Sequence, residues 1–231
     1  MQVIKKSPLK VAVLVAFSTF PAFVFASGTP VDVGLRVGTL GPSIEVSKPI
    51  NEKWSARLSY GNFSRSTSTA SNDLNLAARL NMQHIGAIAD YHPFGGGVRL
   101  SLGLFNNNQV VDFTAKANAG NFTFNGTKYA LESVGSAGGE VGFGNSLAPY
   151  LGLGWSSGSN NEGGLALAID AGVLMNGAPI TTFTVTCGAG LSTAQCNTLK
   201  SDVSSEQDKL ANDVKKFTVY PVISLGLNYR F

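Results

Sequence analysis

The chain ends in the stretch TVYPVISLGLNYRF, Thr218 to Phe231, in which apolar side chains alternate with small or polar ones. One face would carry Val219, Pro221, Ile223, Leu225, Leu227, Tyr229 and Phe231, and the other Tyr220, Val222, Ser224, Gly226, Asn228 and Arg230. Side chains of a β-strand alternate between its two faces. An apolar face opposite a mostly small or polar one is typical of a strand between lipid and a polar lumen. The stretch therefore predicts a strand of a transmembrane barrel.

The first 26 residues have the pattern of a secretory signal peptide. Lys5, Lys6 and Lys10 precede a short apolar run, and Ala26 is a small residue at a suitable cleavage position. We expect cleavage there, which leaves residues 27–231 as one barrel domain. An uncleaved membrane helix, the alternative, would need a longer apolar run. Without the three lysines the chain has 14 basic and 14 acidic residues, so its charge gives no indication of nucleic-acid binding.

The rest of the sequence divides into eight alternating segments separated by turn residues. They are Asp32–Gly38, Ser43–Lys48, Trp54–Phe63, Leu74–Tyr91, Val98–Lys116, Glu140–Trp155, Leu165–Pro179 and Phe217–Phe231. Single-chain bacterial barrels close with an even number of antiparallel strands. We predict an all-β fold, a closed antiparallel transmembrane β-barrel of eight strands. Ten strands would follow if a long loop held another hairpin, and a soluble two-sheet sandwich is the other alternative.

The connections between these segments alternate between short and mostly longer. The short set is Pro49–Lys53, Pro93–Gly97 and Ser156–Gly164, and the other set is Thr39–Pro42, Ser64–Asp73, Ala117–Gly138 and Ile180–Lys216. Short turns on the periplasmic side and longer external loops are typical of outer-membrane barrels. We therefore expect the outer membrane of a Gram-negative bacterium, with both barrel termini in the periplasm. An aromatic girdle on that side would consist of Trp54, Tyr91, Trp155, Tyr229 and Phe231.

The fourth segment changes phase part-way along. Leu76, Leu80 and Met82 share one face, whereas Ile85 and Tyr91 share the opposite one. An extra residue in one strand shifts the alternation by one position. The pattern predicts a β-bulge near Met82 to His84.

Charged residues of the eight segments fall mainly on the face that would point into the barrel. They are Asp32, Arg36, Glu45, Arg57, Arg79, Asp90, Arg99, Glu140, Asp170 and Arg230, five acids and five bases. The interior of an eight-stranded barrel is only wide enough for side chains to fill it. Unpaired buried charges are costly, so we predict a lumen plugged by ion pairs. A narrow or gated ion path lined by the arginines is the alternative.

The last long loop has the features of a helix. Ser192 and Gln195 form a capping box, and Leu199, Val203 and Val214 follow at helical spacing, together with Leu210. Cys187 and Cys196, the two cysteines, predict a disulfide in an oxidising compartment. The helix would act as a lid or pack structurally, or it would recognise an external partner.

The sequence offers little to support catalysis. His84 and His92 are the two histidines, and neither is followed two residues later by the serine that a known lipid-deacylating barrel family uses. Phosphate-binding glycine motifs are absent as well. We expect no cofactor, no metal and no enzymatic activity. A lipid-modifying hydrolase built around His84 is a third alternative.

Four stretches resemble an uncharacterised family of small proteobacterial outer-membrane barrels. They are Val37–Pro42, Tyr91–Ser101, Ala148–Trp155 and Tyr220–Phe231. The resemblance implies an architecture similar to the OmpA-type transmembrane domain, without the peptidoglycan-binding domain that OmpA-type proteins append. Chains that end in such a strand also resemble clients of the barrel-assembly machinery, which would recognise the Phe231 strand.

Together these features predict a structural or surface-interaction protein of the outer membrane. Its contacts would be membrane lipid and lipopolysaccharide, with no nucleic acid, and the external partner of the last loop is not identified. The alternative function is a small gated channel or transporter for ions or small solutes.

Overall fold

The computed structural model describes residues 30–231 except 71–73, 118–120, 131–132 and 158–162. The predicted signal peptide, residues 1–26, lies outside the described residues, and its cleavage stays a prediction. The strands are β1 (Asp32–Gly38), β2 (Ser43–Pro49), β3 (Trp54–Ala70), β4 (Leu74–Tyr91), β5 (Val98–Ala117), β6 (Asn121–Phe124), β7 (Thr127–Ala130), β8 (Val134–Phe143), β9 (Leu147–Ser156), β10 (Gly164–Leu174), β11 (Pro179–Cys187) and β12 (Tyr220–Arg230). The helix α1 (Thr193–Val214) lies between β11 and β12.

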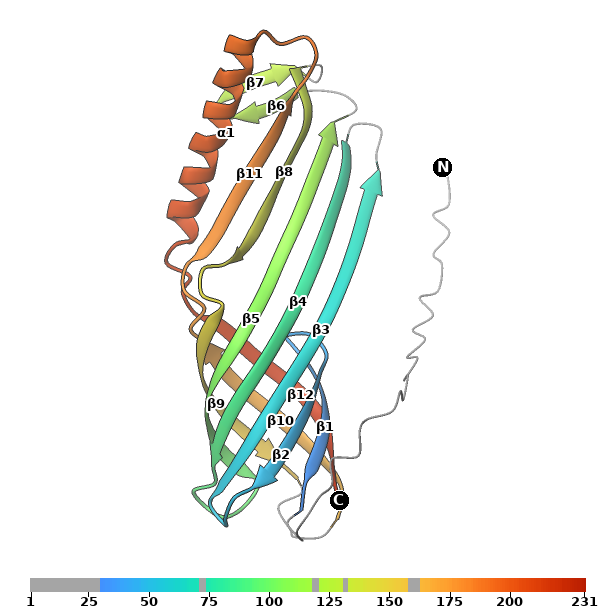
Figure 1. Ribbon diagram of the computed structural model, residues 1–231, viewed down its shortest axis with the longest axis vertical. Helices are drawn as coiled ribbons and strands as arrows, with labels where there is room; N and C mark the ends of the chain where they lie inside the picture. Colours follow the sequence, from blue (N-terminus) through green and yellow to red (C-terminus); the bar gives the residue numbers. More distant parts are fainter. Residues whose placement is uncertain (1–29, 71–73, 118–120, 131–132, 158–162) are drawn as a thin grey trace, which may run out of the picture.

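Eight of these strands close a ring, shown in the lower half of Figure 1. Going around the ring, the antiparallel neighbours are β1, β2, β3, β4, β5, β9, β10 and β12, and β12 pairs again with β1. The prediction of a closed antiparallel barrel of eight strands is confirmed. The terminal strand β12 is central to closure, because it pairs with β1 along seven residues and with β10 along eleven.

The sequence assigned some residues to the wrong segment. The predicted strand Glu140–Trp155 is two strands, β8 and β9, and only β9 belongs to the ring. The predicted loop from Ser64 onward continues β3 as far as Ala70. Two long predicted loops also contain strands: the β6–β7 hairpin lies between β5 and β8, and β11 follows β10. Stretches rich in Ser, Asn and Gly were therefore interpreted as loops although part of each lies in a strand.

Three ring strands are much longer than the others and rise beyond the ring (Figure 1). We call the part beyond the ring the extension: residues 62–70 of β3, 74–83 of β4 and 107–117 of β5, with all of β8 and β11. There β8 pairs with β5, and β11 pairs with β8. The strand order across the extension is therefore β3, β4, β5, β8, β11.

The two faces of the sheet exchange their polarity between the ring and the extension. In the ring the outer face is apolar, with Leu58, Leu102 and Leu153 about 60% exposed, whereas the lumen face is charged. In the extension the outer face is polar, and much of the inner face, which continues the lumen face, is apolar, although Arg65, Asn107 and Gln109 also lie on it. The inner face carries Leu76, Ala78, Leu80 and Met82 of β4, Val111 and Phe113 of β5, and Phe183 and Val185 of β11.

The predicted bulge near Met82 to His84 is wrong. β4 pairs with β3 and with β5 in unbroken register from one end to the other. His84 and Met82 therefore point to the same side of the sheet, one into the lumen and the other onto the inner face of the extension. The phase change in the sequence reflects a change of surroundings along a regular strand, since each face matches what it contacts.

The helix α1 packs beside β11 and against the β6–β7 hairpin (Figure 1). Ser192 caps it, and the reciprocal bonds between Ser192 and Gln195 form the capping box. Leu199 and Val203 are buried with Val134, and burial of each apolar side chain contributes about 1.5–3 kcal/mol. A disulfide joins Cys187, the last residue of β11, to Cys196 in the first turns of α1. Among the described residues, no helix has the length and apolar character to span a membrane.

Candidate functional site: a buried ion-pair layer in the ring

Six charged side chains from six different ring strands meet inside the barrel. They are Arg36 of β1, Glu45 of β2, Arg57 of β3, Asp90 of β4, Arg99 of β5 and Asp170 of β10. All six are buried. Each reaches the lumen because it occupies the inward parity of its strand. Members on neighbouring strands lie two residues apart along the ladder, with Glu45 opposite Ser59 and Arg57 opposite Ser47, and the stagger of the strands brings them together. We call this set the ion-pair layer.

Arg57 is the centre of the layer. Its Nε and Nη2 donate to the two carboxylate oxygens of Asp90, at 2.7 and 3.0 Å, in a bidentate pair. Its Nη1 donates to Glu45 Oε2 at 3.2 Å and to Asp170 Oδ1 at 3.4 Å. The planar guanidinium can make this set of bonds because its five donors have a fixed fork geometry. One side chain thus connects three carboxylates.

The two other arginines complete the charge balance. Arg36 Nε donates to Glu45 Oε2 at 2.9 Å, and Arg99 Nη2 donates to Asp170 Oδ1 at 2.6 Å. Three guanidinium groups and three carboxylates therefore face one another in one layer. Removing one partner of a buried ion pair leaves an uncompensated charge, which costs about 3–5 kcal/mol. Loss of a single member of the layer is therefore expected to destabilise the folded ring.

Glycine provides the space that the layer occupies. A Cβ at Gly226 would collide with Arg36 Nη1 and with the carbonyl oxygen of Leu35. A Cβ at Gly154 would lie 2.6 Å from Arg99 Nε. Small residues at these inward positions let long arginine side chains cross the lumen, and this is a role that the charged residues alone did not indicate.

A second layer lies on the side of the extension. His84 Nε2 is 3.3 Å from Ser59 Oγ, and the rings of Phe105 and Tyr150 meet edge to face with centroids 5.4 Å apart. Leu40, Ile88, Ala148, Leu174 and Val222 are buried in the same cluster. The lumen is thus filled by apolar side chains above the ion pairs.

The space left in the lumen is unequally divided by the ion-pair layer. A cavity of about 380 Å³ lies on the side of the chain end, and Arg57, Asp90 and Arg99 form part of its wall. On the other side a space of about 30 Å³ borders His84 and Tyr150. A space of that size is far too small for a hydrated ion.

The rim of the larger cavity contains another ion pair. Arg230 donates through Nε and Nη2 to the two carboxylate oxygens of Asp32, at 2.6 and 2.7 Å. His92 lies in the same wall, where it is 3.1 Å from Ser55 Oγ and 3.2 Å from the carbonyl oxygen of Gly96. Its contacts hold the turn that follows β4.

Eight of the ten predicted lumen charges lie in the ring, six in the layer and two at the rim. The assignment of Arg79 and Glu140 to the lumen is wrong. Both are exposed and belong to the extension, where Arg79 lies opposite Asp112 and Asp112 lies opposite Glu140. The error arose because the apolar face of each strand was taken to be its outer face along the whole length. In the extension the apolar residues lie on the inner face instead.

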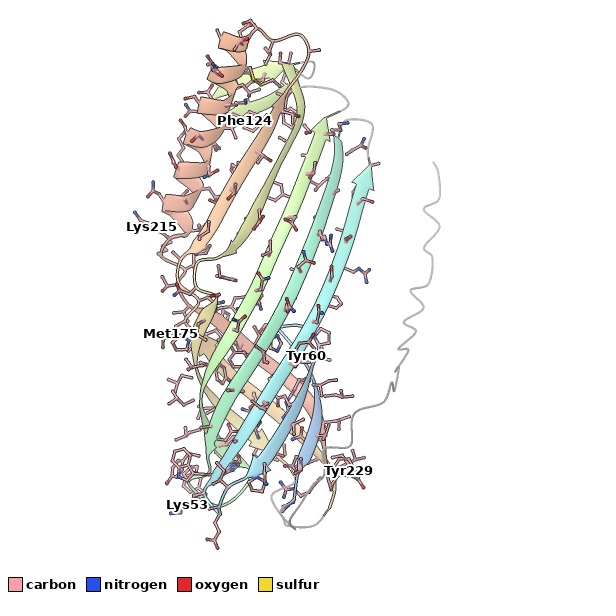
Figure 2. All side chains as sticks on the ribbon, viewed as in Figure 1. Lys53, Tyr60, Phe124, Met175, Lys215 and Tyr229 are labelled. Atoms are coloured by element: carbon pink, nitrogen blue, oxygen red, sulfur yellow. A yellow bond between two sulfur atoms is a disulfide. The ribbon has the colours of Figure 1, made fainter. Side chains whose placement is uncertain are left out.

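The predicted girdle residues gather at the end of the ring where the chain ends. The rings of Trp54 and Tyr91 lie 5.0 Å apart, and those of Tyr229 and Phe231 lie 4.8 Å apart. Trp155 is paired with Val98 at the start of β5. Figure 2 shows Tyr229 at this end and Tyr60 near the level at which the long strands leave the ring.

Ser59, Ser101 and Tyr150 were missed by the sequence analysis. Ser101 Oγ donates to Asp90 Oδ1 at 2.5 Å and accepts from Arg57 Nη2 at 3.2 Å, so it hydrogen-bonds to two members of the ion-pair layer. Its position two residues after Arg99 on the same strand face was the available signal. Within the described part of the chain, no three His, Cys, Asp or Glu residues are grouped in a way that could hold a metal ion.

The fold is similar to that of two solved crystal structures. CarO of Acinetobacter baumannii superposes with a TM-score of 0.61 at 22% identity, over 87% of this chain and 98% of CarO. CarO2 of the same organism has a TM-score of 0.58 at 19% identity, over 89% of this chain and all of CarO2. No family model and no curated protein sequence matches the chain. These similarities show a shared fold.

Proposed function

We propose that this protein is an integral outer-membrane barrel whose lumen is closed and whose extension serves a structural or surface-interaction role outside the cell. The single observation that supports this most strongly is the ion-pair layer. Its six residues span the lumen from six strands, and their charges balance. A solute would have to separate several buried ion pairs to pass.

The apolar outer face of the ring supports a position in lipid. A band of large apolar side chains surrounds the ring, and an aromatic group lies at the end near the chain terminus. Lipid tails and lipopolysaccharide would contact this band, and aromatic rings favour the headgroup level. In this proposal both termini are periplasmic, the Phe231 strand is recognised during assembly, and no catalytic step or cofactor is involved.

Conductance tests the closed lumen. The purified chain is refolded, its folding is checked by heat-dependent migration on gels, and it is then added to a planar lipid bilayer. The proposal predicts a silent bilayer for folded protein. Discrete current steps from the folded protein would overturn it.

A gated channel is the second candidate, and the two lumen spaces support it. Both spaces border Arg36 and Arg57, so a rearrangement of one layer and the adjacent cluster would connect them. If the protein conducts, an Arg99→Ala variant should change its ion selectivity. Steps whose selectivity does not respond to Arg99 would argue against a path through this layer.

A further inference from the structure

The two edges of the extension differ in whether another element covers them. At one edge, α1 covers β11, and Gln207 Oε1 accepts a hydrogen bond of 2.7 Å from the backbone N–H of Phe183. At the other edge, residues 62–70 of β3 pair with β4 only. No strand among the described residues pairs with the opposite side of this segment. About half of these nine residues therefore direct their backbone donors and acceptors to the open edge.

The open edge has one of the features that protect such edges, the inward-pointing charge of Arg65, and lacks the others. Natural sheets protect an edge by charged side chains (above all lysine), proline, an inward-pointing charge, a bulge or a very short strand. The segment Asn62–Ala70 reads NFSRSTSTA, contains neither lysine nor proline, and keeps unbroken register with β4. Its serines and threonines are small side chains that leave the backbone accessible. The edge is thus a template for an additional strand.

The charge around the edge selects one kind of strand. Arg65 lies on the inner face opposite Leu80, and Arg79 lies on the outer face opposite Ser66. Both are exposed, and neither makes an ion pair within 4 Å in the part of the chain that the structure describes. Asp112 lies opposite Arg79 but contacts Asn81 at 3.5 Å instead. An added strand with acidic side chains would lie directly beside Arg65 on the inner face, whereas Arg79 lies one strand further away, on β4.

A second copy in the same membrane does not fit this edge. Two copies would be related by an axis along the barrel, so their β3 strands would run in the same direction with equivalent residues at equal height. Each exposed N–H would then face the N–H of the other copy. Parallel strands pair through alternating donors and acceptors, so this arrangement cannot form a ladder.

We propose that the free edge of β3 at residues 62–70 binds an extended, acidic segment of a partner protein by addition of a β-strand. This inference rests on the proposed surface-interaction role and gives it a location and a ligand chemistry. Backbone hydrogen bonds provide the binding, while Arg65 selects carboxylates on the inner face. Phe63, half-buried beside Met82, offers an apolar contact to one side chain of the added strand.

The test uses the full folded chain in lipid nanodiscs and two fluorescent peptides. One peptide is Thr-Val-Glu-Val-Thr-Val-Glu-Val-Thr, and the other replaces both glutamates by lysine. We expect the acidic peptide to bind, measured by fluorescence anisotropy, and to slow hydrogen exchange of amides in residues 62–70. We expect Arg65→Glu to weaken it by about fivefold, in the range of an exposed ion pair that is reversed. Lys200→Glu on α1, an exposed control, should have no effect.

Proline substitution separates edge binding from nonspecific adsorption. In an antiparallel strand, adjacent residues direct their N–H groups to opposite sides, so of Ser66 and Thr67 one faces β4 and the other the open edge. Ser66→Pro and Thr67→Pro are both made, and the variant that keeps native exchange in β4 identifies the open position. That variant should lose binding of the acidic peptide.

Equal binding of the two peptides, absence of binding, or undiminished binding by that variant would overturn the inference. None of these results alters the conductance of the folded barrel. Current steps in the bilayer would reject the closed lumen without affecting the peptide result, so the two proposals fail separately.

Discussion

The ring and the extension share three strands, β3, β4 and β5, yet the faces of these strands have opposite polarity in the two regions. On the outer face of β5, Leu102 and Leu104 lie in the ring, and Asp112 and Thr114 follow in the extension. On the opposite face Arg99 and Ser101 give way to Val111 and Phe113. The strand itself stays regular across this change.

The contrast shows that the alternation of a strand records its surroundings. In a barrel within lipid the outer face must be apolar, and polar groups are placed in the lumen. In a sheet in water the polar face points outward, and the apolar face is covered, here in part by α1 and the β6–β7 hairpin. The level at which the faces exchange therefore indicates where the proposed membrane ends, between Ile85 and Gln83 on β4.

The largest expected effect comes from the centre of the ion-pair layer. Replacing Arg57 by Met removes the cation that connects three buried carboxylates, and we expect the free energy of unfolding to fall by about 3–5 kcal/mol. Urea unfolding in lipid vesicles, followed by the fluorescence of Trp54 and Trp155, measures it. Arg79→Met is the matched control, since this arginine is exposed in the extension and should change stability by less than about 0.5 kcal/mol. Equal losses of unfolding free energy in the two variants would mean that the buried Arg57 contributes no more to stability than the exposed Arg79.

The next effect concerns the outer face along β5. Leu102→Arg places a charge in the apolar band and should reduce stability in a bilayer by about 2–4 kcal/mol. Thr114→Arg lies on the same face of the same strand, but in the extension, and should be nearly neutral. The same unfolding measurement compares them. A large cost at both positions would place lipid around the extension as well and contradict the proposed boundary.

The sequence could predict most of the ring because ring strands have a constant environment. From Val219 to Phe231 each side chain contacts either the outer surface or the lumen, so alternation, turns and strand parity agree. The same rule failed on the long strands, where Arg79 was assigned to the lumen and the phase change in β4 was attributed to a bulge. Those errors share a cause: a single strand passes through two environments, and a period of two gives no indication of which environment applies.

The ion-pair layer could be predicted in its residues but not in its geometry. Inward parity was enough to bring Arg36, Arg57 and Asp170 into one lumen. Arg57 bridges Asp90, Glu45 and Asp170, and Gly154 and Gly226 provide the space. Both features depend on the stagger of strands around the ring. Stagger is set by the closure of all eight strands together, which pairwise alternation cannot reveal.

A smaller effect should separate the extension from the ring through the disulfide. Changing Cys187 and Cys196 together to Ser removes the link between β11 and α1. We expect the opening free energy of the first turns of α1 to fall by about 2–3 kcal/mol, as for a short disulfide loop. Native-state hydrogen exchange measures this, and ring amides serve as the internal reference because local stability differs between regions. Faster exchange in the ring would show that the two parts unfold as one unit.

The smallest effect is a pH dependence confined to α1 and the hairpin. Asp202 accepts hydrogen bonds from the Tyr129 hydroxyl and from Asn125 Nδ2, and these bonds lower the pKa of the Asp202 carboxyl below its ordinary value of 3.8. A depressed pKa stabilises the folded form above the ordinary value, and this contribution is lost as pH falls through the lowered pKa. Hydrogen exchange of α1 amides should therefore accelerate, after correction for the intrinsic pH dependence, only below about pH 4. Tyr129→Phe should reduce this acid response. Exchange of ring amides should change neither with the fall in pH nor with the substitution. An acid response that is equal in Tyr129→Phe would show that the contact between α1 and the hairpin does not depend on this carboxylate, and that the extension is held by its apolar contacts and the disulfide.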